Sequence, residues 1–334
     1  RSRETREREY EGIRVVEVGE WTRKASAPLS PAFPGWMKKL KADIWHFHVP
    51  NPTGDMSYLL ARPKGKVVAT YHSDIFRQKK LMALYGPFLR SFLRKCDVIM
   101  PTSPRQIDGS YVLPPFREKC VPVPLGMPLE KFERTAEAGR RAREVKKRYK
   151  GFPLIVFVGR MRYYKGLQFL VSALRGVPRV HAMLIGGGYE EPKLKRLAEE
   201  LGVADRTHFL GGLPDEEMVA HLHAADMFVL PSHIGAEAFG LVQVEAMACG
   251  LPVISTNLPT GVPYVNQHGE TGLVVEPGDD EALAAAIAEL LSDQNRRLKM
   301  AEKALRRAHA EFSRDRMAQR LLHVYDKLGG KITD

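Results

Sequence analysis

The chain has 334 residues, which suits two domains better than one, and its hydrophobic content of 44% excludes a disordered or fibrous protein. The net charge of +12 is uneven: residues 1–150 carry 31 Lys and Arg against 16 Asp and Glu, or +15, whereas residues 151–334 carry 20 against 23, or −3. The basic half favours an anionic partner. A membrane surface, a phosphorylated lipid and nucleic acid are the alternatives, beside an ordinary solvated surface.

No apolar run of about 18 residues occurs, and the charged segment RSRETREREYEG is unlike a signal peptide, so we expect no membrane span. Cys96, Cys120 and Cys249 lie in unrelated contexts, without the spacing of a disulfide framework or a zinc site. We therefore expect a cytoplasmic protein without a bound metal.

In the first half, short β-branched runs alternate with helical stretches, which predicts parallel strands joined by crossover helices. The expected strands are residues 13–18, 43–48, 67–72, 97–101 and 120–124. The first of them follows mostly charged residues, whereas a doubly wound domain usually opens on an apolar strand. We therefore expect this chain to lack the N-terminal strand, helix and strand of its first domain.

The alternation restarts after a charged helical segment at 140–151. Strands are expected at 154–160, 181–187, 207–212, 227–232, 251–256 and 272–277, and helices at 214–226, 279–293, about 296–312 and 314–328. The pattern predicts an α/β protein with two doubly wound, parallel-sheet domains that face a central cleft. The expected domains are residues 1–128 and 153–313, with a linker at 129–152 and a helix at about 314–330 packing back on the first domain.

Ligands of open α/β sheets bind beyond the carboxyl ends of the strands. Arg160 and Lys165 follow the expected strand at 154–159, where the arginine fork and the lysine point charge suit one phosphate group. Two ordinary surface cations are the alternative. The glycines 186–188 follow the next strand, where they either let the backbone approach a ligand or form a tight turn.

The densest segment is HIGAEAFGLVQVEAMACGLPVIST, residues 233–256. Glu237 precedes Phe239, Gly240 and Leu241 at the start of an expected helix, whose free N–H groups make an anion site suited to a diphosphate. Glu245 lies eight residues further on, roughly 12 Å along a helix axis. That distance is too long for two carboxylates that act on one bond, and it fits the two ends of an elongated ligand.

The segments E-A-F-G-L-V-Q-V-E (237–245) and V-G-R-M-R-Y-Y-K-G (158–166) resemble the E-x7-E and phosphate motifs of the retaining glycosyltransferase family 4, of GT-B fold. The likeness runs from about residue 10 to 328. The resemblance implies that Glu245 binds the nucleotide ribose, and that Arg160 and Lys165 neutralise the diphosphate. It also implies that Glu237, with the Phe239, Gly240 and Leu241 backbone, holds the sugar and β-phosphate, and that the base rests near Gly211 and Leu213.

The segment Y-H-S-D (71–74) resembles the family segment whose histidine, here His72, lies beside the reacting sugar. H-F-H-V-P-N-P (46–52) resembles the loop that shapes the acceptor side, so we expect His48, Asn51 and Asp74 there. His46 and His48 could be mistaken for a metal pair, but no carboxylate or cysteine set completes one. The family's N-terminal Gly-Gly loop and histidine-bearing helix have no counterpart here.

The segment S-D-I-F-R-Q-K (73–79) resembles mannosyltransferases of glycolipid or surface-polysaccharide synthesis. The resemblance implies a metal-independent, cofactor-free hexosyltransferase that moves mannose with retention to a glycolipid or polyprenyl-linked acceptor. GDP-mannose is favoured as donor over UDP-sugars. Residues 73–95 combine apolar and basic residues at helical spacing, which suits peripheral contact with the inner membrane face, a core helix with a solvated basic face being the alternative.

Two other kinds of protein are alternatives. The same architecture serves nucleotide-sugar epimerases and glycogen-type phosphorylases. A basic nucleic-acid-binding protein would also fit the charge of the first half, but it leaves the spacing of Glu237 and Glu245 unexplained.

Overall fold

The computed structural model describes residues 2–24, 27–76 and 79–329 of the chain. It divides into two compact units, one of Arg1–Val123 with Arg320–Asp334 and one of Pro124–Gln319. Each unit has its own hydrophobic core. The segment 129–152, which we expected as a linker, belongs to the second unit, where it holds the 3₁₀ turn η2 (Glu130–Phe132) and helix α5 (Ala136–Arg148).

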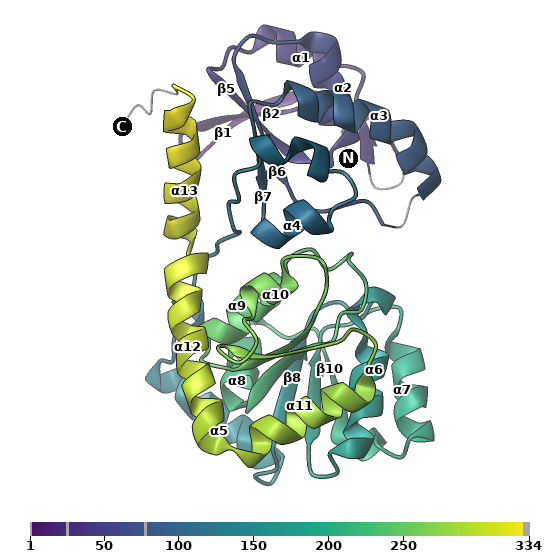
Figure 1. Ribbon diagram of the computed structural model, residues 1–334, viewed down its shortest axis with the longest axis vertical. Coiled ribbons are helices and arrows are strands. Elements are labelled where there is room, and N and C mark those ends of the chain that lie inside the picture. The colour runs from purple at the N-terminus through teal and green to yellow at the C-terminus, as the bar shows by residue number, and fades with distance from the viewer. Residues whose placement is uncertain (1, 25–26, 77–78, 330–334) are drawn as a thin grey trace. The chain divides into compact units, whose positions relative to one another are not determined.

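The first unit is built on a three-stranded parallel sheet of order β5 (Ile44–Val49), β6 (Lys66–Tyr71) and β7 (Val98–Pro101), labelled in Figure 1. These strands lie where the β-branched runs predicted them. The segment expected as a strand at 120–124 contributes a single bridge, from Cys120 to Ile99. The helical elements of this unit are α1 (Phe33–Lys39), α2 (Pro52–Ala61), α3 (Lys79–Lys95), α4 (Pro104–Gly109) and η1 (Pro114–Lys119).

The expectation that residues 13–18 form a strand of this parallel sheet was wrong. β2 (Ile13–Glu17) instead pairs antiparallel with β1 (Arg6–Tyr10), and β3 (Thr22–Lys24) pairs with β4 (Ala27–Leu29). The turn of the first hairpin places Glu11 at φ 51° and Gly12 at φ 78°. Two consecutive residues of positive φ match the right-handed twist of a hairpin, so this turn directs β2 back along β1.

The second unit is a six-stranded parallel sheet of order β10-β9-β8-β11-β12-β13. Its strands are β8 (Leu154–Val158), β9 (His181–Ile185), β10 (Thr207–Gly211), β11 (Met227–Leu230), β12 (Val253–Thr256) and β13 (Gly272–Val275). Strand order reverses beside β8, which lies between β9 and β11. The carboxyl ends of β8 and β11 therefore form the switch point at which open α/β sheets bind ligands.

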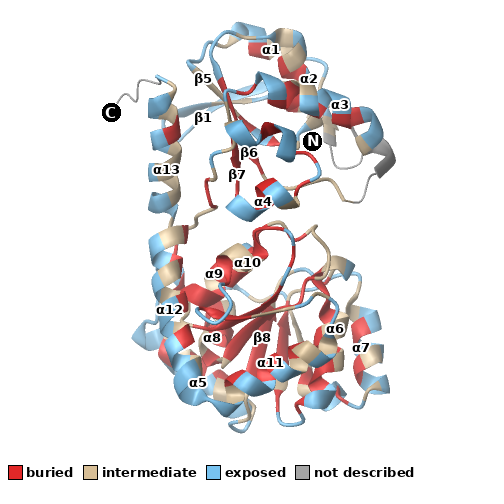
Figure 2. Ribbon diagram, in the orientation of Figure 1, coloured by how far each residue is buried: buried red, intermediate tan, exposed pale blue. Residues whose placement is uncertain are grey.

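Helices flank this sheet, and Figure 2 shows its strands buried while the outer helix faces are exposed. The helical elements are η3 (Tyr163–Lys165), α6 (Leu167–Ala173), η4 (Leu174–Gly176), α7 (Glu191–Glu200), η5 (Ala204–Arg206), α8 (Asp215–Ala224), α9 (Leu241–Ala248), α10 (Val262–Val265), α11 (Asp280–Ser292), α12 (Gln294–Phe312) and α13 (Arg314–Lys327). Burial on both faces explains why the strands read as continuous apolar runs. The division between the units falls within α13.

Phe312, at the end of α12, connects the core to the predicted donor segment. It is fully buried, and its ring meets those of Phe239 and Tyr264 edge-on, at centroid distances of 5.8 and 6.1 Å. Phe239 itself is 3% exposed. The aromatic contacts therefore fix the loop that leads into α9.

We expect Phe312→Ala to lower the free energy of unfolding by about 3–5 kcal/mol, because it leaves a cavity under Phe239. Denaturant unfolding measures this. Leu298→Ala on the same helix is the matched control, since Leu298 is 57% exposed and its truncation should change stability by less than about 0.5 kcal/mol. Equal losses in the two variants would contradict the packing role of Phe312.

Candidate functional site

A buried ion pair lies at the switch point of the second unit. Lys165, after β8, places its Nζ 2.5 Å from Oε2 of Glu237, after β11, and both side chains are at most 10% exposed. Ser232, fully buried, donates its hydroxyl to the same Oε2 at 3.0 Å. The structure thus brings together two residues that the sequence assigned to different parts of a ligand.

A further hydrogen bond holds the backbone of Ser232. Thr256, at the end of β12, donates its hydroxyl to the carbonyl of Ser232. Ser232 was missed in the sequence analysis, although it directly follows the apolar run of β11 and Pro231. Its position immediately after a buried strand at the switch point was the available signal.

Arg160 is the second cation that the sequence assigns to the site. It is exposed, and among the described residues it makes no ion pair. Two residues earlier β8 ends, so Arg160 and Lys165 leave the same strand. An exposed guanidinium without an ion pair is free to bind a ligand oxygen by its planar fork.

The glycines 186–188 are explained by packing between neighbouring loops. A Cβ on Gly186 would lie 2.2 Å from the carbonyl oxygen of Gly159, and one on Gly188 would lie 2.2 Å from that of Met161. Met161 N also donates to Gly187 O at 3.0 Å. These glycines therefore hold the Arg160 loop against the loop after β9.

Gly240 begins α9 at φ 71°. A Cβ there would meet the Gln243 amide at 2.7 Å and Leu230 at 2.8 Å, so packing and the positive φ both favour glycine. No side chain of the described residues caps this helix. In its first turn, Gln243 N donates to Gly240 O at 2.8 Å, and helix N-termini in general attract anions through the N–H groups that have no such partner.

Glu245 lies inside α9, half-buried. Burial raises the pKa of its carboxyl, the Lys131 ammonium opposes that rise, and Asp215 adds to it. Lys131 Nζ binds Asp215 Oδ2 at 2.9 Å, so part of its charge is already used. A half-buried carboxylate with little compensation is suited to accept hydrogen bonds from hydroxyls.

Gly211 and Leu213 lie at the end of β10. Gly211 has φ 67° and accepts from Gly186 N at 2.6 Å, and Leu213 packs partly buried against the core. Gly211 therefore adjoins the loop after β9. Strand β10 is an edge strand of the sheet, and β9 and β8 separate it from β11.

The expected residues of the first unit gather at the carboxyl ends of β5 and β6. His48 Nδ1 lies 2.9 Å from His72 Nε2. Asn51 caps α2, accepting from Gly54 N at 3.2 Å. Asp74 accepts from the Tyr71 and Ser110 hydroxyls at 2.6 and 2.7 Å and from Tyr111 N at 3.1 Å, so it holds its own loop in place.

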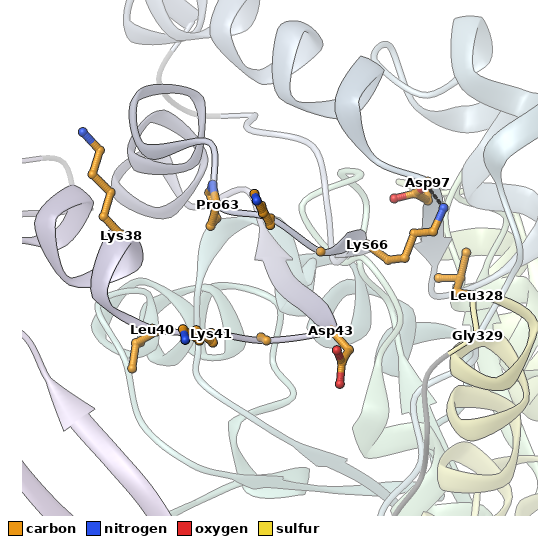
Figure 3. A pocket seen from close by; sticks show the side chains of 12 residues that line it. Lys38, Leu40, Lys41, Asp43, Pro63, Lys66, Asp97, Leu328 and Gly329 are labelled. Atoms are coloured by element: carbon orange, nitrogen blue, oxygen red, sulfur yellow. Dashed lines mark hydrogen bonds and ion pairs between the residues drawn. The ribbon is translucent and has the colours of Figure 1, made fainter.

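A pocket of about 930 Å³ lies at the opposite, amino-terminal edge of β5 and β6 (Figure 3). Lys38, Lys41 and Lys64 line it, and Lys66 points to Asp97, with an Nζ–Oδ1 distance of 3.2 Å. These side chains are exposed. The pocket adds basic surface to the first unit and is separate from the histidine pair.

Two α/β units, one with cations and a helix N-terminus at the switch point of a parallel sheet, are the architecture of a GT-B glycosyltransferase. A sucrose-phosphate synthase from Thermosynechococcus elongatus has the same fold, with a TM-score of 0.77, 24% identity, and coverage of 97% of this chain and 85% of that one. Anabaena HepE, in a complex with UDP, aligns with a TM-score of 0.75 at 19% identity, over 89% of this chain and 82% of that one.

The chain belongs to the family of glycosyl transferases group 1, whose model matches residues 140–307, and residues 1–109 match the model of glycosyltransferase family 4. The O-antigen chain mannosyltransferase C of Escherichia coli is 33% identical over 321 residues, which cover 96% of this chain and 85% of that protein. The chain is therefore a glycosyltransferase.

Two further relatives align over shorter stretches. D-rhamnosyltransferase WbpZ of Pseudomonas aeruginosa is 38% identical over 74% of this chain and 64% of its own length. A GDP-mannose-dependent alpha-(1-6)-phosphatidylinositol monomannoside mannosyltransferase of Mycobacterium tuberculosis is 35% identical over 60% of this chain. This chain spans 54% of the length of that mannosyltransferase.

We expect Lys165→Met to lower the free energy of unfolding by about 3–5 kcal/mol, because it leaves the Glu237 carboxylate buried without its counter-ion. The double variant Lys165→Met/Glu237→Gln should recover most of that loss. A double-mutant cycle measured by denaturant unfolding checks both values. Additive effects of the two single substitutions would show that the pair is not coupled.

Proposed function

We propose that the chain transfers mannose from GDP-mannose to a hydroxyl of a glycolipid or polyprenyl-linked acceptor, with retention at the anomeric carbon. The observation that carries this proposal is the Lys165–Glu237 pair at the switch point, beside the N-terminus of α9. The names of two relatives, both mannosyltransferases, support the choice of sugar, and one of those names specifies GDP-mannose.

The proposed binding mode follows the order of residues along the site. Arg160, Lys165 and the first N–H groups of α9 neutralise the diphosphate, and this charge stabilisation strengthens as the leaving group departs. Glu237 accepts from the sugar hydroxyls while Ser232 and Lys165 hold its carboxylate. Glu245 accepts from the ribose hydroxyls, and the base lies near Gly211 and Leu213. The chain then needs no cofactor besides its nucleotide-sugar substrate.

Retention is proposed as departure and attack on the same face of the sugar. The residues assigned to the donor include a carboxylate, Glu237, that is occupied by Lys165 and Ser232. A carboxylate with its Oε2 so engaged is better suited to orient the sugar than to form a covalent intermediate. Configuration of the product, read by NMR from the anomeric coupling, tests this step.

A thermal-shift series with GDP-mannose, UDP-glucose and ADP-glucose tests the donor. We expect GDP-mannose to raise the unfolding temperature most, since a ligand at 100 times its dissociation constant adds about 2.7 kcal/mol of stability. Glu245→Gln should weaken donor binding by about tenfold or more, because a hydrogen bond to a charged group is lost. Glu270→Gln, at a surface ion pair with Lys303, is the matched control and should bind as the unchanged chain does.

Turnover is then followed as GDP release with and without a lipid-linked acceptor. Transfer requires release that depends on the acceptor. The proposal fails if no nucleotide sugar stabilises the chain and none is consumed. An altered sugar nucleotide produced without acceptor would identify an epimerase instead.

We further propose that the first unit binds an anionic membrane surface through α3. Leu84 and Phe88 are 73% and 47% exposed on one face of this helix, and exposed Arg90, Arg94 and Lys95 follow them. Tyr85, Leu89 and Phe92 on the neighbouring face of the helix are buried. The arrangement of apolar and basic residues suits a bilayer interface. No helix within the described residues is long and apolar enough to span a membrane.

Leu84→Ser/Phe88→Ser should lower binding to phosphatidylglycerol-containing vesicles at least about tenfold, because two apolar side chains no longer leave water. Sedimentation with vesicles of phosphatidylglycerol and phosphatidylcholine measures it, with pure phosphatidylcholine as the uncharged reference. Leu298→Ser, at an exposed position in the second unit, serves as control. Unchanged binding in the double variant would refute contact through α3.

A further inference from the structure

Three histidines of the first unit form a row at the carboxyl ends of β5 and β6. His46 and His48 alternate on β5 and so share one face of the sheet, and His72 follows β6. The rings of His46 and His48 stack with centroids 4.8 Å apart, and those of His48 and His72 with centroids 5.1 Å apart. The rings are within 21° of parallel.

His46 anchors this row. Its Nδ1 lies 2.7 Å from the Tyr325 hydroxyl of α13, and its Nε2 lies 2.7 Å from the Thr70 hydroxyl. Burial, and then the charges of His48 and His72, lower its pKa to about 4. His46 therefore stays neutral near pH 7, with both ring nitrogens hydrogen-bonded, and its fixed ring packs against that of His48.

The contact between His48 and His72 links the protons of the two rings. A hydrogen bond between two imidazole nitrogens 2.9 Å apart needs one N–H and one lone pair, so it holds a single proton. If His48 donates, the proton of neutral His72 sits on its Nδ1. If His72 donates through Nε2, its Nδ1 has no proton and presents a lone pair. The tautomers of the two rings are therefore linked.

Protonation of the two rings is linked in the same way. One added proton turns both outer nitrogens, Nε2 of His48 and Nδ1 of His72, into donors. A second would place two N–H groups face to face across the 2.9 Å contact. Burial lowers the pKa of His72, and the charge of His48 lowers it further.

We propose that His48 is a positioning residue that shares one proton with His72, so that the two rings take up and release one further proton as a unit. In its neutral form the pair presents one N–H donor and one lone pair on its outer nitrogens. A hydroxyl, which both donates and accepts, is the chemical group that matches this pair. This inference rests on the proposed function where it names a sugar or acceptor hydroxyl as the ligand.

The polar groups near the His48–His72 pair have hydrogen-bond partners other than these two rings. Tyr325 of α13 and Thr70 of β6 bind His46. Gln106 of α4 donates to the backbone carbonyl of His72 at 2.9 Å, and this bond does not involve the His72 ring. Asp74 on the same loop is held by Tyr71, Ser110 and Tyr111. Among the described residues, His48 is therefore the titratable side chain that contacts the His72 ring directly.

The experiment is a pH titration of the whole chain labelled with ¹⁵N-histidine, followed by two-bond ¹H–¹⁵N spectra that report tautomer and charge. We expect the His48 and His72 signals to share an inflection. In His48→Leu the pH titration of His72 should shift and its preferred tautomer should change, because the nitrogen that shares its proton is gone. His309→Leu, at an exposed position of α12, should leave the His72 signals unchanged.

His48→Gln is the conservative variant, since its amide can donate to or accept from His72 Nε2. It should retain the tautomer of His72 while it abolishes the shared inflection. Identical His72 titrations and tautomers in the unchanged chain and in His48→Leu would overturn the proposal. These spectra need no substrate, so they can fail while the transferase activity stands.

Activity supplies the complementary readout. His48→Leu should reduce kcat by about tenfold or more with little change in the KM for donor, and His48→Gln should restore most of it. The pH dependence of kcat should lose the shared inflection in both variants. Linked spectra without turnover on any nucleotide sugar would remove the proposed function and leave the histidine pair intact.

Discussion

The buried ion pair between Lys165 and Glu237 is the constraint on which the switch point of the second unit depends. Two charged side chains at most 10% exposed are stable only if each compensates the other and further hydrogen bonds satisfy the carboxylate. Ser232 supplies that bond, and Thr256 holds the backbone of Ser232. Strands β8, β11 and β12 are thereby connected at their carboxyl ends. These contacts fix the orientation of the Glu237 carboxylate.

The two cations of the segment 158–166 lie in different environments. Lys165 is occupied by a carboxylate, and Arg160 is exposed and unpaired among the described residues. Under the proposed function, the diphosphate meets Arg160 and the N-terminus of α9 first, and Lys165 as part of a neutral pair. Electrostatic attraction of the donor then depends mainly on the arginine and the helix terminus.

The sequence predicted the six-stranded sheet well because each of its strands is an apolar run buried on both faces. It failed at the first hairpin, since the charged residues of β1 carry no apolar alternation and their pairing depends on the turn at Glu11 and Gly12. The motif residues were found by spacing. Their contact was not, because Lys165 and Glu237 meet only when β8 and β11 become neighbours. The role of Ser232 was hidden for the same reason.

Helix α13 has a consequence for how the protein is divided. It begins in the second unit, yet Tyr325 near its end binds His46 of the first. A fragment that stops at Gln319 would keep every residue of the donor motifs and lose the phenol that fixes the histidine row. The C-terminal turns of α13 therefore support His46 of the first unit. A domain boundary placed directly after the donor motifs would remove the Tyr325 hydroxyl from His46.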